Sequence, residues 1–289
     1  MTTVHVESTD GVVLALHHLS ECEPGSLPTI LLSHATGFHG RCWLPVARHL
    51  EGRFDVWAHD HRGYGDSLVP DDWLVRWEAF GDDALAAATY LTTHVRPGKT
   101  FAAGHSMGGA TLIMAALRRP EIFSGIVAFE PIVFPQTGFR PDNMPPNPLA
   151  AATRKRRTTF ASIDEARANF ASKPPMSAFR PDALDAYVDH GFRPTNDGVT
   201  LKCNPEHEAR TYETGGGHTT WNALAGLCVP LWVLGSPEQP FQPSSIAPRI
   251  ADEVPDGSFE MWPEVSHFGP MEDPARFADY VAGLAARIG

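Results

Sequence analysis

The sequence has few cysteines and no long apolar run. Its four cysteines, Cys22, Cys42, Cys203 and Cys228, show no paired spacing, which argues against a disulfide framework or a zinc-binding cluster. No stretch of about 18 consecutive apolar residues occurs, so we expect no membrane-spanning helix. Residues 1–7 contain neither a basic stretch nor an apolar core. We therefore expect no secretory signal and a cytoplasmic protein with reduced thiols.

Basic residues are also scarce. The chain of 289 residues has 23 Lys and Arg against 34 Asp and Glu, for a formal net charge of −11. An acidic surface repels nucleic acids and anionic membranes, so we expect neither as a main partner. Hydrophobic residues make up 43% of the chain, which is ordinary for a globular protein with a substantial core. Both a monomer and a homodimer remain open.

Short apolar runs alternate with segments of helical periodicity along much of the chain. Runs without polar alternation are typical of strands buried on both faces of a parallel sheet, so the pattern predicts an α/β fold. The expected strands are residues 4–7, 12–18, 29–33, 54–58, 101–103, 125–129, 230–234 and 258–262, and the expected helices include residues 78–93, 110–118 and 274–288.

This alternation breaks between residues 135 and 221. The segment is rich in proline and polar residues, and it contains helix-like stretches at 163–171 and 181–190. We interpret it as an inserted lid, or cap domain, within a core formed by residues 1–134 and 222–289. Its basic cluster, residues 154–157, is interpreted as a solvated helix face.

One short motif carries a specific chemical prediction. Gly104-His105-Ser106-Met107-Gly108 fits the pattern G-x-S-x-G, after an apolar strand and before a helix. In this arrangement the serine sits on a tight strand-to-helix turn, where its neighbours must be small. The turn lifts the serine hydroxyl above the sheet edge, which predicts Ser106 as a nucleophile.

Three segments together resemble the α/β-hydrolase superfamily. They are residues 60–67 (DHRGYGDS), 104–109 (GHSMGG) and 266–274 (SHFGPMEDP), which stand in the order typical of that superfamily. The resemblance implies a mostly parallel eight-stranded sheet with flanking helices and a helical lid inserted after strand 6. A serine at residue 106 is similar to the esterase, lactonase and carbon–carbon hydrolase branches. Epoxide hydrolases and haloalkane dehalogenases of this fold usually have aspartate there, so those chemistries are disfavoured.

The resemblance also implies a base and an oxyanion hole. His267 follows the expected eighth strand, where the superfamily has its base; an imidazole can accept the serine proton and return it to the leaving group. The N–H of Met107, directly after the nucleophile, is expected to donate to the oxyanion. The second donor is expected from the N–H of Thr36, although Ala35 stands where relatives often have glycine. No cofactor and no metal are expected.

Two glutamates fit the acid that orients the base. Glu130 directly follows the sixth strand, where certain dehalogenases and some serine lactone hydrolases have their acid. Glu238 follows the seventh strand, where most superfamily members have an aspartate. We favour Glu130, because a carboxylate at the end of a buried strand and next to Pro131 should be rigid and poorly solvated. Glu238 lies in a loop bracketed by proline.

The expected substrate is a medium-sized, largely apolar ester or lactone. Lids over this fold supply apolar pocket walls, and the candidate substrate-binding residues are Phe134, Tyr212, His218 and Trp221. Two other functions remain open. One is hydrolysis of a carbon–carbon bond in a diketone-like compound, and the other is a non-enzymatic small-molecule receptor on the same scaffold.

Overall fold

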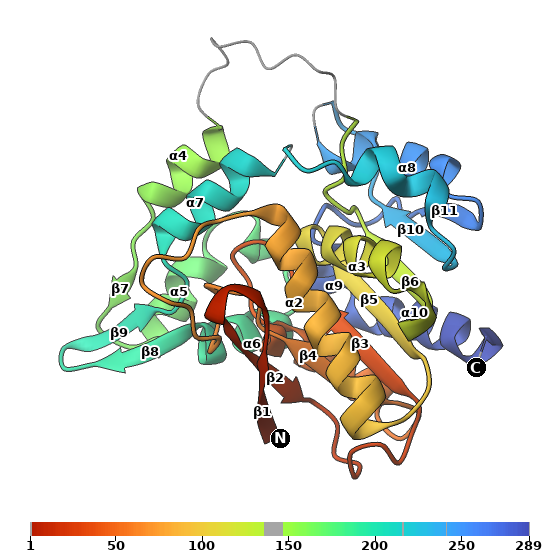
Figure 1. The fold of residues 1–289 in the computed structure, drawn as a ribbon. Coiled ribbons are helices and arrows are strands. Elements are labelled where there is room, and N and C mark those ends of the chain that lie inside the picture. The colour runs from red at the N-terminus through yellow and green to blue at the C-terminus, as the bar shows by residue number, and fades with distance from the viewer. Residues whose placement is uncertain (1, 136–146, 216, 241, 289) are drawn as a thin grey trace.

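An eight-stranded sheet runs through the core in the order β1-β2-β4-β3-β5-β6-β10-β11 (Figure 1). The computed structural model describes residues 2–135, 147–215, 217–240 and 242–288. The strands β1 and β2 form an antiparallel hairpin and β2 is antiparallel to β4, while all further neighbours are parallel. This sheet confirms the expected α/β-hydrolase fold. Its strands are β1 (Thr2–Glu7), β2 (Val13–His18), β3 (Thr29–Ser33), β4 (Asp55–His59), β5 (Thr100–His105), β6 (Phe123–Phe129), β10 (Leu231–Gly235) and β11 (Gly257–Met261).

Helices cover both faces of this sheet. The helices α2 (Trp77–Tyr90) and α3 (Met107–Arg118) pack against each other on one face, in front of the sheet in Figure 1. On the other face α1 (Leu44–Leu50) packs against α10 (Pro274–Ile288). Every residue of β3, β4 and β5 is buried between these layers, which explains why those strands lack polar alternation. Two shorter helices, α8 (Ala247–Glu253) and α9 (Gly269–Glu272), flank β11 in the chain.

Residues 147–214, between β6 and β10, form a separate layer beside the core sheet (Figure 1). It contains helices and also a three-stranded sheet in the order β7-β9-β8, which the expectation of a helical lid did not include. The hairpin between β8 and β9 turns at Asn196-Asp197 before Gly198, a typical hairpin turn composition. Residues 136–146 of the expected lid lie outside the described residues. The elements are α4 (Pro148–Arg154), β7 (Thr159–Phe160), α5 (Ile163–Ala171), α6 (Pro181–Gly191), β8 (Phe192–Thr195), β9 (Gly198–Leu201) and α7 (Pro205–Thr214).

None of the helices in the described residues has the length and apolar character needed to cross a bilayer.

The core contains an unusual number of buried histidines, and these predict acid sensitivity. Burial lowers the pKa of His34 to about 4 and the pKa of both His39 and His59 to about 3. Burial also holds the pKa of His61 and His105 well below the usual value. These rings are therefore neutral in the folded protein at pH values where the unfolded chain takes up protons.

We expect the free energy of unfolding to be highest above pH 6.5 and to fall as the pH drops from 6.5 toward 4. The unfolded chain binds the extra protons in this window, which lowers stability by up to about 1.4 kcal/mol per pH unit for each such histidine. Urea unfolding at pH 7.5 and pH 5.5 measures the effect. Equal free energies of unfolding at the two pH values would contradict it.

Candidate active site

Ser106 sits in a strained turn between β5 and α3. Its backbone has φ 56° and ψ −114°, a conformation that residues other than glycine rarely adopt. Its N–H donates to the carbonyl of Phe129, 2.9 Å away, so the end of β6 holds the turn in place. The residue is buried, with 6% of its surface exposed.

Two glycines make this turn possible. A Cβ atom at Gly104 would lie 2.6 Å from the carbonyl carbon of Gly108, and a Cβ atom at Gly108 would lie 2.0 Å from the carbonyl oxygen of Ser33. Neither position accommodates a side chain without moving backbone. The close approach at Gly108 also brings the start of α3 against the end of β3, from which the loop containing Thr36 begins.

The structure brings His267 and Glu130 together from segments 137 residues apart. His267 Nδ1 lies 2.6 Å from Glu130 Oε2. Glu130 is fully buried directly after β6, whereas the His267 side chain, in the loop after β11, is 24% exposed. An imidazole held at Nδ1 by a buried carboxylate presents its other nitrogen, Nε2, for proton transfer.

Ser236 fixes the other oxygen of this carboxylate. Glu130 Oε1 accepts hydrogen bonds from the backbone N–H of Ser236 at 2.7 Å and from its hydroxyl at 2.6 Å. Burial alone would raise the pKa of Glu130, but the contacts with His267 and Ser236 outweigh it and hold that pKa below its usual value. The carboxylate is therefore ionised at neutral pH. The sequence analysis missed Ser236, although β6 and β10 are neighbours and both glutamate and serine follow their strand ends.

The alternative acid lies elsewhere. Glu238, two residues beyond Ser236, is exposed in the loop after β10. The structure thus brings Glu130, and not Glu238, to His267.

The two expected oxyanion donors lie in the helix start after Ser106 and in the loop after β3. Met107 is the first residue of α3, and N–H groups in the first turn of a helix have no partner within the helix. Thr36 is in the loop after β3, which the contact between Gly108 and Ser33 holds against the same end of α3. The amino end of a helix also favours negative charge.

Two rings, those of His105 and Phe268, lie beside His267 and continue into an aromatic cluster with other segments. The ring of His105, within the G-x-S-x-G motif, lies 4.8 Å from the ring of His267. Phe268 lies 5.8 Å from His105 and 6.1 Å from Phe38 of the loop after β3. Phe179, from the inserted segment, lies 5.6 Å from Phe268. Phe268 thus connects the candidate base to apolar rings of the loop after β3 and of the inserted segment.

The four candidate substrate-binding residues lie in different parts of the structure. Phe134 is partly buried against the core. Tyr212 is partly buried on α7, and its carbonyl accepts a hydrogen bond from the Asn147 side chain. His218 is buried, with its two ring nitrogens 2.8 Å from the carbonyl of Ile132 and 2.9 Å from the Thr220 hydroxyl. Trp221 lies under the guanidinium of Arg249, on α8. His218 and Trp221 thus make contacts that connect the inserted segment with the core.

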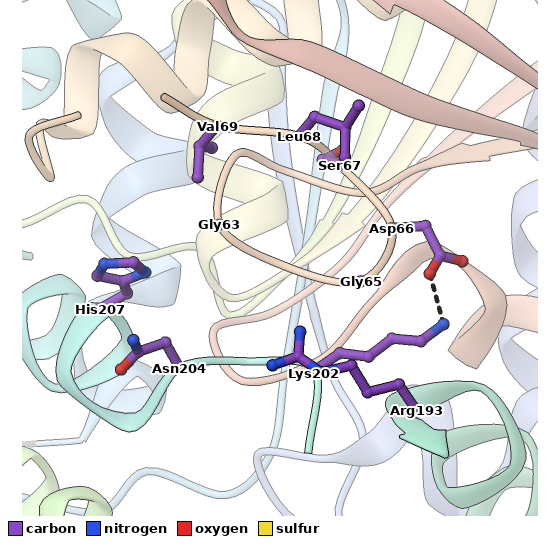
Figure 2. A pocket seen from close by; sticks show the side chains of 10 residues that line it. All are labelled: Gly63, Gly65, Asp66, Ser67, Leu68, Val69, Arg193, Lys202, Asn204 and His207. Atoms are coloured by element: carbon purple, nitrogen blue, oxygen red, sulfur yellow. Dashed lines mark hydrogen bonds and ion pairs between the residues drawn. The ribbon is translucent and has the colours of Figure 1, made fainter. Parts of the chain in front are cut away.

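A polar cavity of about 390 Å³ lies between the loop after β4 and the inserted segment (Figure 2). An ion pair of 2.5 Å between Lys202 Nζ and Asp66 Oδ1 crosses it. Neither Ser106 nor His267 is among its lining residues, so it is separate from the candidate catalytic groups. Its lining residues are Gly63, Gly65, Asp66, Ser67, Leu68, Val69, Arg193, Lys202, Asn204 and His207.

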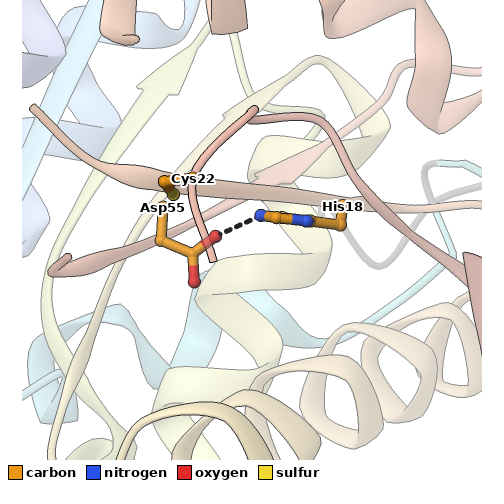
Figure 3. A group of neighbouring side chains, drawn as sticks. All are labelled: His18, Cys22 and Asp55. Carbon is orange, nitrogen blue, oxygen red and sulfur yellow. Dashed lines mark ion pairs between the residues drawn. The ribbon is translucent and has the colours of Figure 1, made fainter. Parts of the chain in front are cut away.

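Among the described residues, two groups of three side chains have the spacing of potential metal ligands. One consists of His18, Cys22 and Asp55 (Figure 3), where His18 Nε2 lies 2.7 Å from Asp55 Oδ1. This group lies where β4 begins, whereas Ser106 lies where the parallel strand β5 ends, so the two are at opposite ends of the strands. The other consists of His17, Asp60 and Asp66, and Asp60 already accepts hydrogen bonds from His17 and from two backbone N–H groups. Neither group includes Ser106, Glu130 or His267.

A family model described as the alpha/beta hydrolase family matches residues 30–280. The chain belongs to this family. Mouse monoglyceride lipase is 33% identical over 132 residues, which are 45% of this chain and 43% of that protein. The 2-(acetamidomethylene)succinate hydrolase of Mesorhizobium japonicum is 27% identical over 177 residues, which are 61% of this chain and 59% of that protein. The chain thus spans less than half the length of the monoglyceride lipases that it matches.

Solved structures show the same fold over nearly the whole chain. E-2-(acetamidomethylene)succinate hydrolase superposes with a TM-score of 0.78 at 19% identity, over 99% of both chains. A thermophilic esterase from Thermogutta terrifontis superposes with a TM-score of 0.69 at 20% identity, over 100% of this chain and 99% of the other. At these identities the likeness concerns the fold alone.

Proposed function

We propose that this protein is a serine hydrolase that cleaves a carboxylic ester or lactone through an acyl-enzyme intermediate. The observation that carries the proposal is the buried Glu130 carboxylate on His267 Nδ1, in a hydrolase-family chain whose Ser106 occupies a strained turn. The name of one relative, monoglyceride lipase, supports the ester as substrate class. The rings around His267 favour a medium-sized, largely apolar substrate.

The proposed reaction begins with attack by Ser106. Its hydroxyl oxygen bonds to the carbonyl carbon of the substrate while His267 Nε2 takes the hydroxyl proton. The negative charge that develops on the carbonyl oxygen is stabilised by the N–H groups of Met107 and Thr36, each worth about 2.7–4 kcal/mol of barrier. Glu130 stabilises the imidazolium and keeps it in the required orientation.

The resulting tetrahedral intermediate collapses by breaking the bond between the carbonyl carbon and the leaving oxygen, which receives the proton from His267. An ester releases this group as a free alcohol, whereas a lactone opens and keeps it as a hydroxyl on the acyl chain. Water then attacks the acyl-enzyme with His267 as base, and the acid product leaves as Ser106 regains its proton.

A substrate panel tests the reaction class. We expect hydrolysis of p-nitrophenyl esters of medium chain length, with acyl-enzyme visible by mass spectrometry, and lower kcat/KM for vinylogous diketones. Preferential cleavage of the diketones would instead assign carbon–carbon bond hydrolysis. Stoichiometric labelling of Ser106 without turnover of either class would favour a receptor.

A further inference from the structure

A partly buried ion pair lies within the inserted segment, next to the candidate oxyanion loop. The guanidinium of Arg156, just after α4, contacts the carboxylate of Glu208, on α7, through both terminal nitrogens. Glu208 is 3% exposed, and the thiol of Cys203 donates to its Oε2 at 3.5 Å. The charges of Arg156 and Glu208 therefore cancel at short range.

This pair is in direct contact with the loop after β3. A Cβ atom at Gly37 would lie 2.7 Å from Glu208 Oε1, so the carboxylate fills the place of a side chain there. Gly37 directly follows Thr36, the proposed oxyanion donor. The polar cluster of Arg156 and Glu208 is thus one residue away from the groups that would stabilise the reacting carbonyl.

Two donors in this cluster have no acceptor within the part of the chain that the structure describes. They are the hydroxyl of Tyr187 and the Nε–H of Arg156, and both atoms are buried. Tyr187 is 1% exposed, and its ring lies 5.2 Å from the ring of Phe38. Burial raises the pKa of Tyr187, and nearby Arg156 opposes this rise. A buried donor without an acceptor is unfavourable and uncommon in native proteins.

We propose that Tyr187 and Arg156 form a polar subsite for a second, neutral oxygen atom of the substrate, such as a ketone oxygen in its acyl chain. This inference rests on the proposed function, which places the reacting carbonyl at Thr36 and Met107. The two free donors require an acceptor. Because Glu208 already neutralises Arg156, the acceptor carries no charge of its own. The preferred substrate is then an oxo ester, with an apolar chain between its two oxygen functions.

Three matched ethyl esters test the subsite: hexanoate, 5-oxohexanoate and the monoester of glutaric acid, followed by pH-stat titration. For the wild-type protein we expect the highest kcat/KM with the oxo ester. Tyr187→Phe removes only the hydroxyl, so the ratio of kcat/KM between the oxo ester and the hexanoate should fall about tenfold. Tyr90→Phe, at a ring that stacks on His94 far along α2, is the matched control and should leave this ratio unchanged. An unchanged ratio in Tyr187→Phe overturns the subsite.

Glu208→Gln tests the charge argument. The glutamine keeps the shape of the side chain against Gly37 but leaves the positive charge of Arg156 without its partner. The kcat/KM of the glutarate monoester should therefore rise at least tenfold relative to that of the oxo ester. An unchanged preference would overturn the assignment of a neutral oxygen. Binding of the same esters to the Ser106→Ala variant, measured by calorimetry, does not depend on hydrolysis. It therefore tests the subsite separately from the proposed function. Discrimination that is seen in binding, and lost in the double variant with Tyr187→Phe, supports the subsite even if the wild-type protein hydrolyses none of the esters.

Discussion

Replacing Ser106 with alanine is expected to lower ester hydrolysis by roughly four to six orders of magnitude. The variant loses the atom that bonds to the carbonyl carbon, and His267 is left without a proton to accept. Any remaining acceleration would come from the N–H groups of Met107 and Thr36. Steady-state kinetics with a p-nitrophenyl ester at saturating concentration measures the loss.

This variant should fold like the wild-type protein. Alanine removes one oxygen atom and has the same backbone restrictions as serine at φ 56°, so the melting temperature should change little. Circular dichroism provides the control. Retention of more than a few per cent of the activity by the folded variant would rule out Ser106 as nucleophile.

Glu130→Gln is expected to lower kcat by about 10²–10⁴-fold. The reason lies in Ser236, whose N–H and hydroxyl both donate to Oε1. In the variant these donors keep the amide oxygen on their side, so the amide NH₂ faces His267 Nδ1. Nδ1 must then accept a hydrogen bond, the proton moves to Nε2, and the ring can no longer take the proton of Ser106.

Glu238→Gln is the matched control for this substitution. It makes the same chemical change only two residues beyond Ser236, at an exposed side chain. We expect kcat within about twofold of the wild-type value, since exposed substitutions remote from a site have small effects. Equal losses in the two variants would discredit the assignment of Glu130, and a larger loss in Glu238→Gln would reverse it.

The sequence predicts the sheet, and it favours Glu130 over Glu238 as the acid without deciding between them. The buried runs of β3, β5 and β6 lie where their apolar composition indicates, because strands covered on both faces have no polar alternation. Glu130 and Glu238, however, follow neighbouring parallel strands at the same sheet edge. Which carboxylate reaches His267 depends on the path of each loop, and periodicity does not encode that path.

The inserted segment shows a second limit of prediction from the sequence. The sequence predicts a solvated face for the basic cluster at residues 154–157, and Arg154 and Arg157 are exposed. Arg156 instead turns inward to Glu208, 52 residues later. The hairpin β8–β9 was also missed, although Asn196-Asp197-Gly198 is a typical hairpin turn. Short strands and buried ion pairs depend on tertiary contacts that a local pattern does not contain.

The central claim is that Ser106 is activated by a histidine that Glu130 holds in place. Peptide mass spectrometry after treatment with a fluorophosphonate measures this most directly, because the reagent reacts with activated serines. We predict a single adduct on Ser106, formed much more slowly in His267→Ala and in Glu130→Gln but at the wild-type rate in Glu238→Gln. No adduct on Ser106, or equal labelling rates in all four proteins, would contradict the account.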